Sequence, residues 1–123
     1  MKKKKYVIKR STTGLGLFAL ADLPPQTRII EYIGKRISKE DADNRYIVYL
    51  NETHALDGKA RANAARYINH SCEPNAAAYT TGKRVWIWSE LAIKAGEEIT
   101  LDYGPEYFDA YIQPVGCRCK KCV

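Results

Sequence analysis

The sequence is centred on a polar stretch that reads Arg66-Tyr67-Ile68-Asn69-His70-Ser71-Cys72-Glu73-Pro74-Asn75. Its amide, imidazole, hydroxyl and thiol groups offer hydrogen bonds and soft ligands within a few residues. Pro74 stiffens the backbone that carries them. A polar cluster between apolar segments is typical of a site loop held by a scaffold, but by itself it is equally compatible with a polar turn. The segments around it decide between the two.

Length and composition indicate one globular domain. The chain has 123 residues, of which 46% are hydrophobic and 28% charged, and these values are ordinary for a soluble domain with a single core. The net charge is +6, and Lys2 to Lys5 supply much of the excess. This basic start is either a solvated, frayed terminus or a contact for nucleic acid or another anionic surface.

The apolar runs of the sequence predict neither a membrane span nor a secretory signal. No apolar run approaches about 18 residues, so no membrane helix is expected. The apolar residues that follow the lysine run, Tyr6 to Ile8, are too few for a secretory signal peptide. We therefore expect a cytoplasmic, reducing environment.

The hydrophobic pattern predicts a mostly β fold with few short helices. Short apolar runs separated by turn residues predict the strands, while Ser38 and the alanine-rich segment 60–67 predict short helical segments. The predicted strands cover residues 6–8, 28–34, 46–50, 55–57, 76–80, 84–89 and 99–103. Within them, Val85-Trp86-Ile87-Trp88 predicts a strand buried on both faces.

The segment Gly14-Leu15-Gly16-Leu17-Phe18-Ala19 fits a dinucleotide-binding fingerprint, and a predicted strand precedes it. However, Asp22-Leu23-Pro24-Pro25 follows, so no long helix can begin there and bind a pyrophosphate with its N-terminus. The chain is also too short for a doubly wound sheet. We interpret the segment as a glycine loop whose backbone lies directly against a ligand.

Three separated segments together resemble the SET-domain protein lysine methyltransferases. In order, they are the glycine loop at 14–19, the polar stretch at 66–75 and Gly96-Glu97-Glu98-Ile99-Thr100-Leu101-Asp102-Tyr103-Gly104. Glu31-Tyr32-Ile33-Gly34 is similar to the family's second strand, and Cys117-Arg118-Cys119-Lys120-Lys121-Cys122 to its post-SET zinc segment. The resemblance covers nearly the whole chain.

The resemblance implies a SET-domain fold, in which small β-sheets surround a pseudoknot. The strand that ends at Tyr103 would thread past residues 69–75 and bring the two motifs together. Three parts are implied: a basic N-terminal segment at 1–5, the SET domain at 6–111 and a post-SET zinc-binding tail at 112–123. The cofactor would be S-adenosylmethionine, bound in a concave pocket on one face, while the substrate lysine enters a narrow channel from the other.

The resemblance also implies roles for individual residues. Tyr103 would be the catalytic tyrosine, with its hydroxyl aimed at the transferring methyl and the amine, and Tyr46 the second catalytic tyrosine. Both would line the substrate channel together with Leu101. The cofactor would contact Leu15, Gly16, Leu17, Asn69, His70 and Tyr103, the first three mainly through backbone atoms.

Several of these residues have a second interpretation. Tyr46 is alternatively a core aromatic of its strand, and Tyr32 packs either near the site or in the core. Leu101 stands where the family often has Phe or Tyr, a residue that limits how many methyls fit. A leucine has no hydroxyl to restrain the amine, so we expect di- or trimethylation rather than strict monomethylation. His54 lies outside the motifs and is assigned no role.

The four cysteines fall at Cys72, Cys117, Cys119 and Cys122. In a reducing compartment this pattern favours a Cys₄ zinc site over disulfides, and Cys117 and Cys119 are too close to pair comfortably. Two residues separate the last two cysteines, where the family's commoner tail has four, and this spacing still allows tetrahedral coordination. A tail with free thiols is the alternative. Zinc binding would tie the C-terminus beside the active site.

The implied function is transfer of methyl groups from S-adenosylmethionine to a lysine side chain of a protein substrate, for which a histone or histone-like protein is the expectation. The alternative is a non-catalytic module of the same fold that binds protein or nucleic acid. For the enzyme, nucleic acid is expected to be an indirect partner at most, and the chain a monomer or homodimer. A histone substrate would place it in the nucleus or on chromatin.

Overall fold

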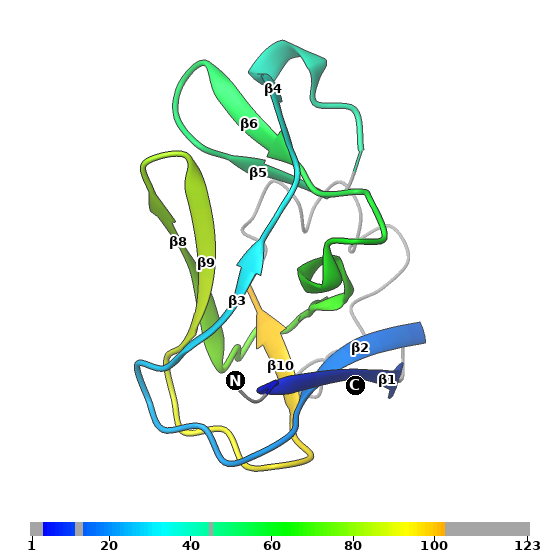
Figure 1. Cartoon of the computed structure of the whole chain (residues 1–123), viewed down its shortest axis with the longest axis vertical. Helices are drawn as coiled ribbons and strands as arrows, with labels where there is room; N and C mark the ends of the chain where they lie inside the picture. The colour runs from blue at the N-terminus through cyan, green and yellow to red at the C-terminus, as the bar shows by residue number, and fades with distance from the viewer. Residues whose placement is uncertain (1–3, 12–13, 45, 103–123) are drawn as a thin grey trace.

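The computed structural model describes residues 4–11, 14–44 and 46–102. Within these residues the chain folds into short strands and 3₁₀ helices, so the expected mostly β fold is confirmed (Figure 1). The elements in chain order are β1 (Tyr6–Ser11), β2 (Gly14–Ala19), β3 (Arg28–Tyr32), β4 (Lys35–Ser38), η1 (Lys39–Asp41), β5 (Ile47–Tyr49), β6 (His54–Asp57), η2 (Ala64–Tyr67), β7 (Asn69–His70), β8 (Ala76–Thr81), β9 (Arg84–Ser89) and β10 (Glu98–Leu101). None of the helices in the described residues has the length and hydrophobicity needed to cross a membrane.

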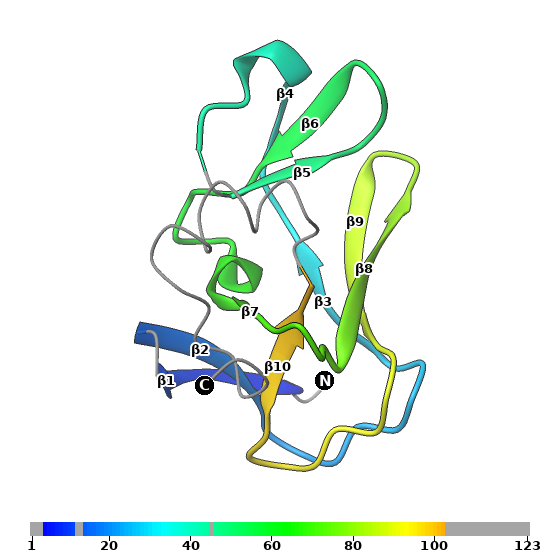
Figure 2. The same cartoon turned by 180° about the vertical axis from the view of Figure 1, so that it is seen from behind.

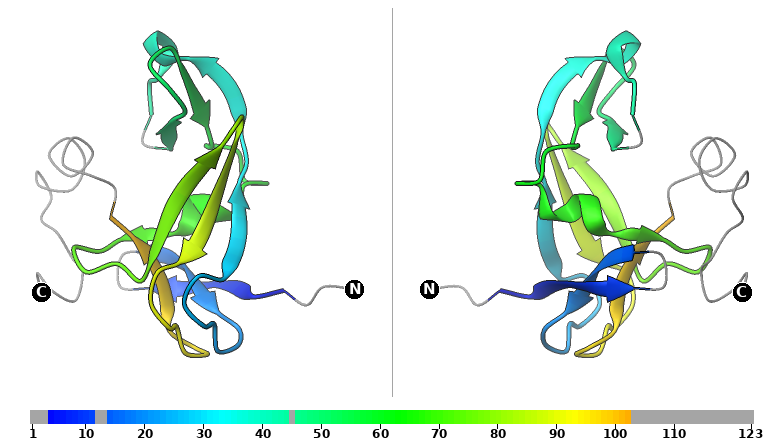
Figure 3. Two further views of the ribbon diagram at one scale, coloured as in Figure 1. Left: turned by 90° about the vertical axis from the view of Figure 1, so that its left-hand side faces the viewer. Right: turned by 90° about the vertical axis from the view of Figure 1, so that its right-hand side faces the viewer.

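The strands form small sheets of order β1-β2-β10-β7, β3-β9-β8 and β4-β6-β5. Their paired strands are antiparallel, apart from β7 and β10, which run parallel. In Figures 1 and 2 the sheet β4-β6-β5 lies at one end of the molecule, β1 and β2 lie at the other, and β3-β9-β8 lies between them. The side views show that β8 and β9 run in a different direction from β1 (Figure 3).

Strand β9 has one buried face and one open face. Val85 and Ile87 are fully buried in the core, whereas Trp86 and Trp88 on the opposite face are only half-buried. The guanidinium carbon of Arg28 lies 4.3 Å from the centroid of the Trp86 ring on that open face. The prediction that this run is buried on both faces is therefore wrong. An antiparallel sheet can leave one face in contact with water, and the alternation follows from that.

The segment interpreted as a glycine loop is strand β2. It pairs with β1 on one edge and with β10 on the other, and the side chains of Leu17 and Ala19 are buried in the core. Glycine is depleted in strands, so the local sequence favoured a loop, and pairing on both edges overrides that preference. Gly14 has a φ of 116°, a backbone conformation that favours glycine.

Other element boundaries also differ from the sequence prediction. The strand expected at 28–34 ends at Tyr32, and β4 follows after Gly34. A Cβ at Gly34 would overlap the backbone carbonyl of Asp57, so the chain can pass this point only with glycine. Ser38 makes no side-chain capping bond to η1, and the segment 60–67 is helical only over η2. The last predicted strand is β10, and its expected end at residue 103 lies outside the described residues.

Asn75 fastens the end of the polar stretch to β10. Its Nδ2 donates to the Glu98 carbonyl over 2.8 Å, and its Oδ1 accepts from the Thr100 N–H over 2.9 Å. The Asn75 N–H in turn donates to Thr100 Oγ1 over 3.3 Å. The side-chain amide therefore satisfies backbone groups of β10 as a neighbouring strand would.

We expect Asn75→Ala to lower the free energy of unfolding by about 2–6 kcal/mol, because it leaves the Glu98 carbonyl and the Thr100 N–H without their partner at about 1–3 kcal/mol each. Asn75→Asp keeps the acceptor for the Thr100 N–H but sets a carboxylate oxygen against the Glu98 carbonyl, so it should also be less stable than the parent chain. Urea denaturation of the three proteins measures these differences. Equal stability of Asn75→Ala and the parent chain would contradict the role of Asn75 in holding β10.

Candidate active site

The candidate site lies where β7 and β10 run side by side (Figure 2). Asn69 pairs with Thr100 and His70 pairs with Leu101. The Ser71 N–H continues the ladder by donating to the Leu101 carbonyl over 2.8 Å. The polar stretch and the second motif are therefore neighbours, as expected from the sequence. Tyr103 follows two positions after Leu101 and lies outside the described residues.

The side chain of Glu98, to which the sequence analysis assigned no role, organises this site. Its Oε2 accepts from Asn69 Nδ2 over 2.7 Å, and its Oε1 accepts from Ser11 Oγ over 2.9 Å. Asn69 Nδ2 also donates to the Leu15 carbonyl over 3.0 Å. These contacts orient the Asn69 amide, because both of its N–H groups donate to them. The Asn69 Oδ1 can then accept a hydrogen bond from a ligand.

Gly16 makes this close approach possible. A Cβ at Gly16 would lie 2.5 Å from Glu98 Oε2 and 3.1 Å from Asn69 Nδ2. A real Cβ essentially never approaches another atom as closely as 2.5 Å, so a larger residue would force Glu98 or Asn69 to move. The glycine therefore allows the Glu98 carboxylate and the Asn69 amide to keep their positions against β2.

His70 presents a buried imidazole to the same region. Its side chain is 6% exposed, and burial lowers the pKa of His70, while the Asp102 carboxylate at 3.9 Å from Nδ1 opposes that effect. Its Nε2 lies 3.5 Å from Cys72 Sγ. The lowered pKa favours the neutral imidazole at neutral pH.

Tyr46 approaches the polar stretch from the sheet β4-β6-β5, and Arg66 connects the two. The guanidinium carbon of Arg66, on η2, lies 4.4 Å from the Tyr46 ring centroid and 5.3 Å from that of Tyr67. A side-chain hydrogen bond with Tyr46 raises the pKa of Arg66 above its ordinary value, and burial opposes this rise. Because η2 leads directly into β7, the stacked guanidinium ties Tyr46 to the element that carries Asn69.

Residues 14–104, which include both motifs and the glycine segment, match the family model of the SET domain. The chain belongs to the SET-domain family. The family resemblance inferred from the sequence is therefore confirmed.

Similar curated proteins are much longer than this SET domain. It is 35% identical over 133 aligned residues to human "Histone-lysine N-methyltransferase 2D", covering 96% of this chain and 2% of that protein. It is 36% identical over 141 residues to "Histone-lysine N-methyltransferase set-2" of Caenorhabditis elegans, covering 99% of this chain and 9% of the relative. A Kluyveromyces lactis protein named "Histone-lysine N-methyltransferase, H3 lysine-36 specific" is 32% identical over 133 residues, with 95% and 19% covered. The chain thus spans less than a fifth of the length of these relatives.

The SET domain exposes the predicted cofactor contacts to different degrees. Leu15 is 50% exposed, whereas Leu17 is fully buried and can meet a ligand only through its backbone. Leu101 is 8% exposed and packs in the core cluster. Tyr32 is buried at 7% exposure, and its hydroxyl donates to the Tyr46 carbonyl over 2.9 Å, so it is both a core residue and a contact of the predicted channel tyrosine.

One of the four predicted zinc ligands, Cys72, is described, and it is half-buried beside His70. Cys117, Cys119 and Cys122 lie outside the described residues. Within residues 4–11, 14–44 and 46–102, no three His, Cys, Asp or Glu side chains gather closely enough to hold a metal ion. The zinc site therefore stays a prediction.

A cavity of about 220 Å³ lies at another place on the SET domain. It is lined by Tyr6, Ile30, Glu31, Ile33, Ala62 and Ala64. None of these residues belongs to the predicted cofactor or channel set, so this cavity is not the candidate site.

We expect Gly16→Ala to displace the Glu98 carboxylate and break its 2.7 Å bond to the Asn69 amide, because the new Cβ would occupy the same space. The side-chain NH₂ resonances of Asn69 in an NMR spectrum should shift as a result. Gly82→Ala is the control for a glycine replacement away from the site: its Cβ meets no atom within 4 Å, although its φ of 61° adds a backbone strain that Gly16→Ala does not carry. Unchanged Asn69 resonances in Gly16→Ala would show that the site tolerates a side chain there.

Proposed function

We propose that this SET domain is an S-adenosylmethionine-dependent protein-lysine N-methyltransferase. The observation that carries the proposal is the parallel pairing of β7 with β10, which sets Asn69 and His70 beside Thr100 and Leu101, immediately before Tyr103. The three relatives described above are named as histone-lysine N-methyltransferases, which supports the same activity.

The polar groups at this edge suit S-adenosylmethionine, which supplies an electrophilic methyl group on a positively charged sulfur when it is bound. The Glu98 carboxylate and the oriented Asn69 amide offer oxygen atoms to a cationic ligand. Gly16 keeps side-chain atoms away from the backbone of β2 at this point. Asn69, His70 and the backbone of Leu15, Gly16 and Leu17 would hold the cofactor, and Tyr103 would complete the site.

The residues of the channel have to favour a neutral substrate amine. Lysine has a pKa near 10.4, so half-neutralising it at pH 7 requires a shift of about 3.4 units, or about 4.6 kcal/mol. Burial in an apolar channel and a nearby positive charge both disfavour the ammonium form. Arg66, stacked on the Tyr46 ring, adds such a charge to the channel wall. No strong base is then required, and alignment by Tyr46 and Tyr103 lowers the barrier further.

The substrate we propose is a histone or a similarly lysine-rich protein, which would place the enzyme on chromatin. The net charge of +6 disfavours direct approach of a basic substrate. Exposed carboxylates at Asp41, Asp43 and Glu73 provide acidic contacts for it. The chain would work as a monomer or a homodimer.

Methyl transfer from radiolabelled S-adenosylmethionine to purified histones tests the proposed activity. We expect Tyr103→Phe to lower turnover by roughly 100-fold or more with the fold intact, an effect comparable to removing one transition-state donor. Mass spectrometry of the product reports the methyl number, for which Leu101 predicts di- or trimethylation. Cofactor binding without transfer to any histone or lysate protein would favour the non-catalytic module instead, and a single added methyl would contradict the role given to Leu101.

We also propose that Cys72, Cys117, Cys119 and Cys122 bind one zinc ion, since four thiolates form a suitable tetrahedral donor set. The purified chain should then carry about one zinc, and Cys72→Ser should lose most of it. Because the metal would fasten the C-terminal tail beside the site, turnover should fall together with zinc content. Metal analysis of both proteins measures this, and unchanged zinc in Cys72→Ser would exclude Cys72 as a ligand.

A further inference from the structure

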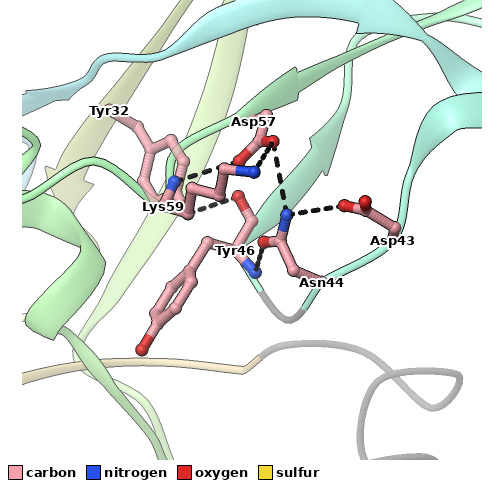
Figure 4. A network of polar contacts seen from close by, with 6 residues as sticks. All are labelled: Tyr32, Asp43, Asn44, Tyr46, Asp57 and Lys59. Carbon is pink, nitrogen blue, oxygen red and sulfur yellow. Dashed lines mark hydrogen bonds and ion pairs between the residues drawn. The ribbon is translucent and has the colours of Figure 1, made fainter.

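The backbone of Tyr46 is held on both of its polar groups by side chains from other positions (Figure 4). Its N–H donates to Asn44 Oδ1 over 2.8 Å. Its carbonyl accepts from the Tyr32 hydroxyl over 2.9 Å and from the Gly58 N–H over 2.9 Å. Tyr46 precedes β5 at the edge of a small sheet, and these bonds fix the point from which its side chain projects.

Asn44 is itself held in one orientation. Its Nδ2 donates to Asp57 Oδ2 over 3.3 Å and to Asp43 Oδ1 over 3.0 Å. A flipped amide would turn its NH₂ toward the Tyr46 N–H and its oxygen toward two carboxylates, so each of these contacts would become repulsive. Asp57 is fixed in turn, because its Oδ1 accepts from the Lys59 N–H over 3.1 Å and its Oδ2 lies 3.7 Å from Lys59 Nζ.

Tyr32 and Gly58, which bond to the Tyr46 carbonyl, are tightly packed and leave little room for the Tyr46 main chain to move. Tyr32 is 7% exposed, and a Cβ at Gly58 would overlap the Tyr32 ring and crowd the Asn63 amide. In Figure 4 the ring of Tyr46 points away from the network of Asn44, Asp57 and Lys59. The ring meets the Arg66 guanidinium instead, at 4.4 Å from the ring centroid to Cζ.

We propose that Asn44 is a positioning residue for Tyr46: supported by Asp57, it holds the Tyr46 main chain so that the ring stays on Arg66 and the hydroxyl stays in the lysine channel. The inference rests on the proposed function, because it assigns Tyr46 to the channel. Asn44 lies outside the motifs on which the family resemblance rests, and it acts only through its neighbour. Loss of its support should let the Tyr46 hydroxyl move, and misplacement of about 1 Å at a reacting centre can lower a rate by up to about 100-fold.

The same sheet provides a matched control in Asn51. Its Oδ1 accepts from the Thr53 N–H over 2.9 Å and from the His54 N–H over 2.8 Å, in the turn between β5 and β6. Asn51→Ala therefore removes the same kind of side-chain-to-backbone contact from the same sheet. It does so without touching Tyr46, Tyr32 or Asp57.

The test uses the full chain with ¹³C-labelled tyrosine, in which the missing signal of Tyr46→Phe identifies the Tyr46 ring. We expect Asn44→Ala to shift or broaden the Tyr46 signal and to lower kcat by roughly tenfold or more, with little change in Kd for S-adenosylmethionine. Asn51→Ala should leave both the signal and kcat unchanged. In the Tyr46→Phe background, Asn44→Ala should lower kcat much less, because the group that it positions is absent.

An exchange of donor and acceptor provides a second route should Asn44→Ala not fold. Asn44→Asp alone keeps an acceptor for the Tyr46 N–H but sets a carboxylate against Asp57, so it should disturb the ring signal. Combining it with Asp57→Asn turns that contact back into a hydrogen bond and should restore part of the signal and of kcat, because the Asp43 carboxylate still faces a carboxylate at position 44.

An unchanged Tyr46 signal in Asn44→Ala, or an equal change in Asn51→Ala, would overturn the inference. Failure of the exchange pair to recover any of the signal lost in Asn44→Asp would do the same. If the signal behaves as expected in a chain that transfers no methyl to any substrate, the positioning of Tyr46 stands and the proposed function fails. The ring signal therefore separates the two claims.

Discussion

The structure depends on the parallel contact between β7 and β10, two strands of two and four residues. Such short strands are not stable alone, and a parallel pair cannot be closed by a tight turn. The chain between them forms the β8–β9 hairpin and returns through the segment before β10. Asn75 holds β10 with its side-chain amide, while Ile68 and Ile99, at 1% and 0% exposure, bury the apolar side of the contact. Motifs far apart in the chain become neighbours through this one pairing.

The same contact explains why polar side chains can be concentrated beside a small core. Glu98 and Asn69 lie on adjacent strands and satisfy each other over 2.7 Å, with Ser11 and the Leu15 carbonyl as further partners. A buried polar group without a partner is costly, so a network of this kind is stable only when its members are satisfied together. Gly16 makes room for the network, since a side chain at this position would collide with Glu98 and Asn69.

The proposed active site has a second half, built on a different sheet. Tyr46 is anchored by Asn44 and Tyr32 at the edge of β4-β6-β5, and Arg66 stacks on its ring from η2. Because η2 runs directly into β7, a movement of Arg66 would affect the positions of both Tyr46 and Asn69. The proposed chemistry needs the cofactor side and the amine side to keep a fixed distance. The Arg66 guanidinium, 4.4 Å from the centroid of the Tyr46 ring, directly connects the two halves.

The sequence by itself determined the family and the β character of this chain. Motif residues and their order are local facts, and alternating apolar residues predict strands without knowledge of their partners. Only the tertiary structure decided which strands pair, so Gly14–Ala19 became a strand although its glycines favour a loop. It also decided the roles of Glu98 and Asn44. Glu98 bonds to Asn69, which is 29 residues away in the sequence, and Asn44 bonds to Asp57, which is 13 residues away. Hydrogen bonds between distant residues leave no periodic pattern in a sequence. For that reason the motifs could be predicted from the sequence, whereas the side chains that hold them in place could not.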